Sequence, residues 1–211
     1  MVDIDVWQLM EPSYVTSGGV RTCRLENPHP ARLVGVSSRG SDDGGVQVVL
    51  MADTHVPKRA KDLPTELWMA VDAADLVIHA GDWVEVDLLD RLQCRSRRLL
   101  ACWGNNDGPA LRRRLPEVAR AEIEGLSVGV VHETGPAAGR ELRCAGLYPD
   151  FDLLCFGHSH IPWDSTTATG LRLLNPGSPT DRRRQPYRSY ITFELVDGAI
   201  LNVHLRQLPQ P

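Results

Sequence analysis

Seven polar side chains of the kinds that bind metal ions each stand just after a short apolar segment. Four of the chain's seven histidines are among them, which is more than core packing alone would require. The positions at which they occur are 23 to 29 residues apart, about the length of one strand–helix–strand crossover. Imidazole, carboxylate and amide oxygen together suit Mn, Fe, Zn, Ni or Co better than Ca or Mg. The set is Asp53, His55, Asp82, Asn105, His132, His158 and His160.

The spacing within this set predicts more than one ion. Asp53 and His55 are two residues apart, as are His158 and His160. On an extended segment such residues point the same way, so we expect each pair to enter one site side by side. Seven ligand-type residues are too many for one ion with an open position, but they suit two ions that share a carboxylate. Asp82 is the candidate bridge. A structural zinc site is the alternative, and the absence of cysteine from the set disfavours it.

These side chains need elements that bring the ends of the apolar segments together. The segments are rich in β-branched residues and predict buried strands at 46–52, 75–81, 98–104, 128–132 and 152–157. Helix-like segments lie between the first three, at 64–74 and 86–92. This alternation predicts βαβ units in a layered α/β fold, in which ligands collect at the carboxyl ends of strands.

The C-terminal part of the chain has a different pattern. Residues 164–175 and 189–205 are typical of β-hairpins, and the second turns at Asp197-Gly198, a favoured type I′ pair. We therefore expect the second half of the domain to supply a mostly antiparallel sheet.

The composition and charge of the chain limit the classes of protein to which it can belong. The 211 residues are 42% hydrophobic and 24% charged, which is typical of a globular domain. Residues 1–45 show no sustained period, predicting a loosely ordered extension before a domain over 46–211. The net charge of −4 disfavours long nucleic acid as a partner. Five irregularly spaced cysteines predict reduced packing residues in a cytoplasmic protein, and no segment is apolar enough for a membrane.

Taken in order, the motifs resemble those of the calcineurin-like metallophosphoesterase superfamily. They are D-x-H at 53–55, G-D at 81–82, G-N-N-D at 104–107, His132 and G-H-S-H at 157–160. N-P-G-S at 175–178 resembles the small bacterial and archaeal phosphodiesterase branch. The resemblance covers about residues 46–206. It implies a four-layer αββα fold, in which two β-sheets pack as a sandwich flanked by helices, with a di-metal site at the strand ends.

The resemblance also implies a ligand set and a reaction. Asp53, His55, Asp82 and His160 would hold one divalent ion, and Asp82, Asn105, His132 and His158 the other. Manganese is the first choice of metal, with Fe, Zn, Ni or Co as alternatives. A hydroxide bridging the ions would attack a small phosphodiester, and Asn105 would meet the charge that develops on phosphorus. A homodimer is plausible by the same resemblance.

Several residues near the motifs depart from the family pattern or extend it. Asn106 stands where many members have a proton-donating histidine, so we expect diesters with good leaving groups and take Asn106 as a substrate contact. Asp107 is expected to support catalysis by orienting a neighbour. Glu133 replaces a common glycine and either reshapes the pocket or faces solvent. The arginine run at 182–184, with Arg182 as the candidate site residue, either meets a substrate phosphate or belongs to a solvated basic loop. His79 is expected to be structural.

Two other functions remain open at this point. One is a nuclease of the same superfamily, which the negative charge and the lack of a sizeable capping domain after the core disfavour. The other is a non-catalytic scaffold with the same fold, which the complete ligand set disfavours. The leading prediction is a metal-dependent phosphodiesterase.

Overall fold

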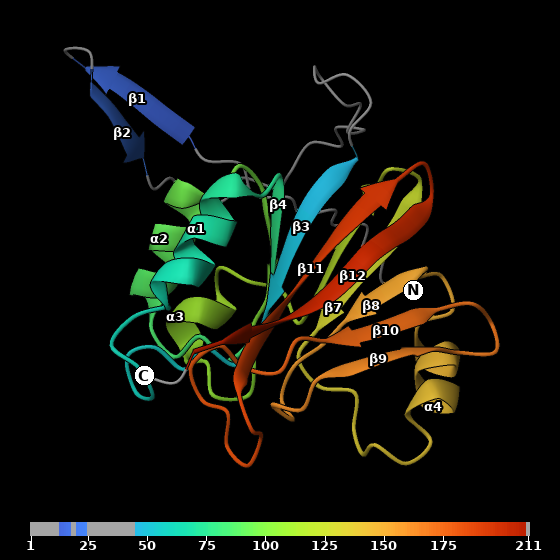
Figure 1. The fold of residues 1–211 in the computed structure, drawn as a ribbon. Helices are drawn as coiled ribbons and strands as arrows, with labels where there is room; N and C mark the ends of the chain where they lie inside the picture. The colour runs from blue at the N-terminus through green and yellow to red at the C-terminus, as the bar shows by residue number, and fades with distance from the viewer. Residues whose placement is uncertain (1–12, 18–19, 25–44, 210–211) are drawn as a thin grey trace.

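The computed structural model describes residues 13–17, 20–24 and 45–209 of the chain. Its first five-stranded sheet has the strand order β12-β11-β3-β4-β5 (Figure 1). The neighbours β3, β4 and β5 are parallel, whereas β11 runs antiparallel to both β3 and β12. The strands are β3 (Val46–Met51), β4 (Leu76–Ala80), β5 (Leu99–Cys102), β11 (Arg188–Val196) and β12 (Ala199–Leu208).

The second five-stranded sheet has the order β6-β7-β8-β10-β9. Two of its pairings, β7–β8 and β8–β10, are parallel, so the expectation of a mostly antiparallel sheet is wrong. In addition, the hairpin β11–β12 joins the first sheet instead of the second. The strands are β6 (Val118–Ile123), β7 (Leu126–Val131), β8 (Leu153–Cys155), β9 (Trp163–Thr166) and β10 (Arg172–Asn175).

Alternating side chains of the central strands separate the protein into layers. On β3, Val48 and Leu50 enter the core between the two sheets, whereas Val49 and Met51 pack on the opposite face. That opposite face is covered by α1 (Thr65–Ala73) and α2 (Val86–Arg95). The short α3 (Pro109–Arg112) lies on the same side, and α4 (Arg140–Leu147) covers the outer face of the second sheet (Figure 1). The predicted αββα sandwich is confirmed.

The helices follow from local sequence. Pro64 immediately precedes α1, where its missing N–H requires no partner. On α2, Leu88, Leu89 and Leu92 are fully buried, and this i, i+1, i+4 spacing forms one apolar face that packs on the sheet. No helix in the described part of the chain is long and apolar enough to cross a membrane.

The predicted N-terminal extension is only partly described. Within it, β1 (Ser13–Ser17) and β2 (Val20–Arg24) form an antiparallel hairpin, although we expected this segment to be loosely ordered. Two five-residue strands are too short to give a sustained sequence period. The rest of 1–44 lies outside the described residues, and the domain boundary at residue 45 stays a prediction.

The cysteines whose side chains the structure describes are of two kinds. Cys102, Cys144 and Cys155 are free and buried, as expected for packing residues. Cys94, on α2, is disulfide-bonded, which contradicts the expectation for that residue. Irregular cysteine spacing carries no signal for such a bond.

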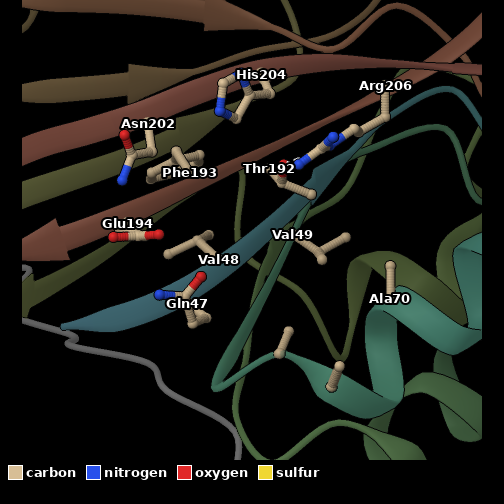
Figure 2. Close-up of a pocket in the computed structure, with 12 residues that line it drawn as sticks. Gln47, Val48, Val49, Ala70, Thr192, Phe193, Glu194, Asn202, His204 and Arg206 are labelled. Carbon is tan, nitrogen blue, oxygen red and sulfur yellow. Dashed lines mark hydrogen bonds between the residues drawn. The ribbon is translucent and has the colours of Figure 1, made fainter. Parts of the chain in front are cut away.

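A cavity of about 450 Å³ lies where β3, β11 and β12 meet α1 (Figure 2). Gln47, Val49, Thr192 and His204 are among the side chains that line it. None of the seven candidate ligands borders this cavity, so the chemistry predicted from the sequence lies elsewhere.

Candidate metal centre

The structure brings all seven candidate ligands to one place, where the strand ends of both sheets meet. Four of them follow strands of the first sheet: Asp53 and His55 after β3, Asp82 after β4 and Asn105 after β5. The other three, His132, His158 and His160, follow β7 and β8 of the second sheet. The centre therefore straddles the interface between the sheets.

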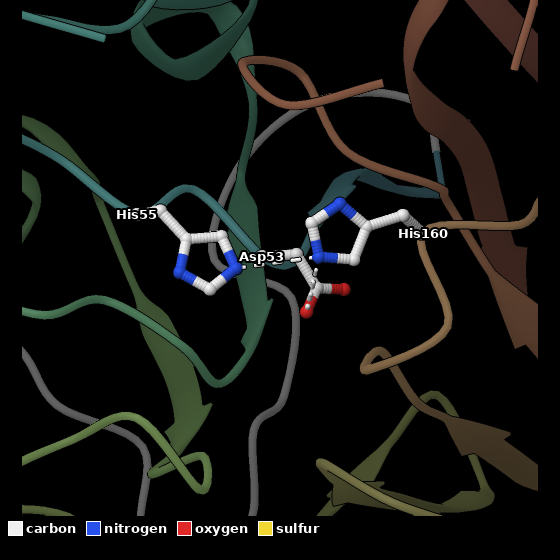
Figure 3. Close-up of side chains that lie close together, drawn as sticks. All are labelled: Asp53, His55 and His160. Carbon is white, nitrogen blue, oxygen red and sulfur yellow. Dashed lines mark hydrogen bonds and ion pairs between the residues drawn. The ribbon is translucent and has the colours of Figure 1, made fainter. Parts of the chain in front are cut away.

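Asp53, His55 and His160 form the first group, with one potential ligand atom from each lying within 4.8 Å of the others (Figure 3). The Nε2 atoms of the two histidines are 3.3 Å apart. Nε2 of His160 is also 3.4 Å from Oδ1 of Asp53. All three residues are buried. Three donor atoms of metal-binding type thus converge on one point.

Asp53, Asp82 and His132 form the second group by the same criterion. Asn105 extends it, because its Oδ1 lies 2.9 Å from both His132 Nε2 and His158 Nδ1. The two carboxylate oxygens of Asp82 face different groups: Oδ2 is 3.5 Å from His55 Nε2, and Oδ1 is 3.4 Å from His132 Nε2. Asp82 therefore lies between the two groups, as a bridging carboxylate would.

The backbone conformation at these ligands differs from the extended segments that the sequence predicted. Asp53 and His55 have φ of 54° and 44°, and His158 and His160 have 69° and 58°, so neither pair is extended. His158 and His160 consequently enter different groups, and the expectation that they stand side by side is wrong. Left-handed conformations of non-glycine residues cost roughly 1–3 kcal/mol each and persist only where surrounding structure imposes them.

Hydrogen bonds between adjacent loops impose these conformations. The Asp53 N–H donates to Gly81 O and the His55 N–H to Asp82 O, each at 3.0 Å, so the loops after β3 and β4 stay paired beyond the sheet. The His158 N–H donates to Asp53 Oδ1 at 3.1 Å, which joins the loops of the two sheets. Gly104 packs so closely that a Cβ there would lie 2.3 Å from the Asp82 nitrogen.

The donor set fits a cation. Asp53 is fully buried, and its Oδ2 has no hydrogen-bond partner. Burial raises the pKa of Asp53 to about 8, because a carboxylate without compensation is costly in the protein interior. A divalent ion at this point would supply the missing compensation. The residues present therefore fit a metal.

The histidines are oriented as metal ligands are. His132 Nδ1 is 2.8 Å from the Ala80 carbonyl oxygen, and His160 Nδ1 is 2.5 Å from that of Asp181. A proton on Nδ1 would donate to these carbonyls and leave the Nε2 lone pair facing the cluster. Burial lowers the pKa of His160 to about 4, which favours the neutral, ligating form.

Asp82 is held ionised in this setting. Burial favours its neutral form, but the hydrogen bond and charge of His132, together with Asn106, hold its pKa below the usual range. Asn106 donates from its backbone N–H to Asp82 Oδ1 at 2.8 Å and from Nδ2 to Oδ2 at 2.6 Å. The amide that we expected to contact substrate is thus already bound to a candidate ligand.

Asp107 holds together the loops that follow β4 and β5. Its Oδ2 accepts hydrogen bonds from the N–H groups of Asp82 and Gly104 at 3.1 and 2.7 Å, and its Oδ1 accepts one from Val84 at 2.8 Å. Burial raises the pKa of Asp107, although these N–H groups oppose the shift. With both oxygens occupied by backbone donors, Asp107 orients Asp82, in keeping with the expected orienting role.

Two supporting residues have no role in the sequence prediction. Asn175 donates from Nδ2 to the Gly157 carbonyl at 2.8 Å, and the Ser178 hydroxyl donates to the Asp53 carbonyl at 2.8 Å. Both belong to the N-P-G-S motif, which the sequence analysis noted only as a family feature. The motif fixes the backbone from which Asp53 and His158 extend.

The basic loop after this motif presents a different arginine from the one predicted. Arg182 is exposed and donates to the Gln185 carbonyl at 2.7 Å. Arg183 is the residue whose guanidinium reaches the centre, with Nη1 3.5 Å from the His158 carbonyl oxygen. Burial is the main cause that lowers the pKa of His55 and His160, and the positive charge of Arg183 lowers both further. In a run of three arginines the sequence cannot distinguish which one faces the site.

Glu133 lies beside a candidate ligand, whereas His79 is buried in the core. Glu133 Oε1 lies 3.8 Å from His158 Nε2 with 55% of its side chain exposed, so this residue stands at the rim of the centre. His79 is fully buried, stacks on Trp83 at 3.5 Å between ring centroids, and lies 3.1 Å from the Thr54 hydroxyl. His79 is structural, as expected.

Comparison with known proteins gives a consistent family. Residues 46–198 match the model of the calcineurin-like phosphoesterase superfamily domain. A "probable metallophosphoesterase" of Methanocaldococcus jannaschii is 33% identical over 158 residues, covering 73% of this chain and 79% of the relative. A solved Thermotoga maritima protein is 31% identical with a TM-score of 0.62, covering 77% and 99% of the two chains.

Two further solved structures share the fold at 19% identity. One is Vps29 of Chaetomium thermophilum, with a TM-score of 0.63 and coverage of 77% of this chain and 97% of its own. The other is described as a novel archaeal phosphodiesterase, with a TM-score of 0.59 and coverage of 77% and 99%.

Proposed function

This chain belongs to the calcineurin-like phosphoesterase superfamily, and from that premise we propose that it is a di-metal-dependent phosphodiesterase acting on small phosphodiesters. The observation that carries the proposal is the buried carboxylate of Asp53. Its Oδ2 lacks a partner at the point where two groups of potential ligands meet. A protein that merely used this fold as a scaffold would have no need for a buried carboxylate with one oxygen left without a partner there.

The seven residues divide between two ions. Asp53, His55, Asp82 and His160 would hold one ion, and Asp82, Asn105, His132 and His158 the other, with manganese as the first choice of metal. When bound, two such cations polarise phosphoryl oxygens and make a water molecule acidic enough to act as a nucleophile near neutral pH.

The chain itself supplies positioning and charge around the reacting phosphate. Asn105 is exposed, and its Oδ1 faces His132 and His158, so its Nδ2 is the group that would donate a hydrogen bond to a phosphoryl oxygen. The guanidinium of Arg183 adds positive charge on the side of His55 and His160. Arg182 remains a weaker candidate for contact with substrate.

The leaving group has no strong proton donor at the position of Asn106. An amide cannot act as a general acid, and this one is bound to Asp82. We therefore expect aryl diesters to be hydrolysed far faster than alkyl diesters, by about 10²–10⁴-fold, the usual contribution of general acid catalysis.

The test is hydrolysis of bis(4-nitrophenyl) phosphate by protein stripped with a chelator and reloaded with Mn²⁺, Fe²⁺, Zn²⁺, Ni²⁺ or Co²⁺. Activity should require a metal and should be lost in Asp82→Asn. Activity in the metal-free protein would overturn the proposal. A folded protein that retains no stoichiometric metal would favour the scaffold, and preferential degradation of single-stranded DNA would favour the nuclease.

Three related expectations are also proposals. Size-exclusion chromatography with light scattering tests the homodimer, and cell fractionation tests a cytoplasmic location without membrane attachment. The three buried free thiols support the cytoplasmic location, whereas the disulfide at Cys94 counts against it.

A further inference from the structure

A second cavity opens directly beside the metal centre. Its volume is about 140 Å³, roughly that of five molecules of liquid water, so it suits a small organic group. Asn105 and His132 form the end that adjoins the centre. A substituent on a phosphate held at the ligands could therefore extend into this cavity, which we call the ester cleft. Trp103, Glu117, Val118, Val131, Glu133 and Tyr148 form the rest of its lining.

Aromatic rings and carboxylates dominate the ester cleft. Trp103 and Tyr148 are half-buried and present ring surface, while Val118 and Val131 supply apolar contact. Glu117 and Glu133 are exposed, and no lysine or arginine lines the cleft. Aromatic faces together with carboxylates attract a cation and repel an anion.

Two arginines lie near the cleft without lining it. The guanidinium of Arg112 lies 4.0 Å over the Trp103 ring, so this ring already takes part in one cation–π contact. Arg112 is held there by a hydrogen bond from Nε to the Asp107 carbonyl at 2.8 Å. Arg120 lies 5.0 Å over Phe151. Both arginines therefore have partners of their own, and Glu133 faces His158 at the mouth of the cleft.

We propose that the ester cleft binds a positively charged amine carried by one of the two ester groups of the substrate. The substrate class is then an aminoalkyl or quaternary-ammonium phosphodiester. This inference rests on the proposed function and narrows it. A second phosphate in the cleft would meet Glu117 and Glu133, so polynucleotides and polyphosphates are disfavoured as substrates.

A matched pair of substrates tests the charge requirement. 4-Nitrophenyl phosphorylcholine and 3,3-dimethylbutyl 4-nitrophenyl phosphate have the same shape and leaving group, and only the first carries a positive charge. The wild-type protein should prefer the cationic substrate by about 5- to 10-fold in kcat/KM, the scale of one cation–π contact with a partly exposed carboxylate. The same ratio should fall toward one in Glu133→Gln and stay unchanged in Glu66→Gln, a control on exposed α1 surface.

A binding measurement separates this inference from the proposed function. Choline titrated into the metal-free protein should shift one indole N–H resonance, which Trp103→Phe removes, and 3,3-dimethylbutanol should shift it far less. Glu133→Gln should weaken choline binding about fivefold. The absence of this shift, or equal use of both substrates, overturns the inference. Equal use leaves the phosphodiesterase intact, whereas choline binding without hydrolysis of either substrate contradicts the proposed function alone.

Discussion

Replacing Asp53 by asparagine should stabilise the metal-free protein, and the gain should grow as the pH rises. Asp53 is fully buried, and its Oδ2 has no partner. Burial raises its pKa from 3.8 to about 8, so the folded state holds a proton that the unfolded chain has already released. Stability therefore falls as the pH rises through this window and is lowest above about pH 8.

The size of the effect follows from the pKa shift. Between pH 5 and the folded-state pKa of about 8, three pH units correspond to about 4 kcal/mol at 1.36 kcal/mol per unit. This is an upper limit, because buried sites relax around a charge. An asparagine of the same shape does not titrate, so we expect Asp53→Asn to gain at least ~2 kcal/mol on the wild type between pH 5 and pH 9.

Urea denaturation followed by tryptophan fluorescence, in chelator at pH 5, 6, 7, 8 and 9, measures this difference. Asp150→Asn, at an exposed turn before β8, is the matched control and should follow the wild type. Parallel stability curves for wild type and Asp53→Asn would refute the reasoning. Adding Mn²⁺ at pH 8 to about 100 times its Kd should raise wild-type stability by ~2.7 kcal/mol for each occupied site, and should raise that of Asp53→Asn by less, because this variant keeps only the ligand set of Asp82, Asn105, His132 and His158 intact.

Three other substitutions test the support around the ligands. Asp107→Asn should weaken metal affinity about 10- to 100-fold in a chelator competition, because it disturbs the backbone donors that orient Asp82; unchanged affinity would remove its positioning role. Gly104→Ala places a Cβ 2.3 Å from the Asp82 nitrogen and should abolish stoichiometric metal by mass spectrometry, whereas Gly108→Ala, with nothing within 4 Å, should bind normally. Ser178→Ala should lower the free energy of unfolding in urea by about 1–3 kcal/mol, since it removes the shorter of two hydroxyl donors to the Asp53 carbonyl and the acceptor of the Asp181 N–H; a change within experimental error would contradict this.

The parallel strands β3, β4 and β5 of the first sheet could be predicted from the sequence because they are mainly apolar runs, whereas the addition of the hairpin β11–β12 to this sheet could not. Apart from exposed Gln47, the residues of Val46–Met51 and Leu76–Ala80 are buried, so these segments show little competing polar pattern. The second sheet could not be ordered in the same way. Val118–Ile123 alternates small and charged residues and was not predicted as a strand. Parallel pairing of β8 with both β7 and β10 depends on contacts between distant segments.

The meeting of the seven ligands was predictable from the sequence, whereas the conformation of the loops that carry them was not. Parallel strands end at one edge of a sheet, so polar residues just after them meet there. The left-handed φ of Asp53 or His55, by contrast, is imposed by hydrogen bonds to another loop and leaves no trace in residue type. Likewise, Arg182 and Arg183 are identical in type, and only the path of the chain decides that Arg183 reaches the centre.

The division of the ligands between the sheets links metal loading to the mechanical integrity of the sandwich. Each ligand group contains residues that follow strands of both sheets, so a bound ion would act as a cross-link between two layers otherwise joined by apolar packing and by hydrogen bonds between loops. Any sliding of one layer over the other would dismantle both coordination sets at once. Amide hydrogen exchange along β4 and β7 should therefore slow together on loading, as a single cooperative unit, even though the two strands belong to different sheets.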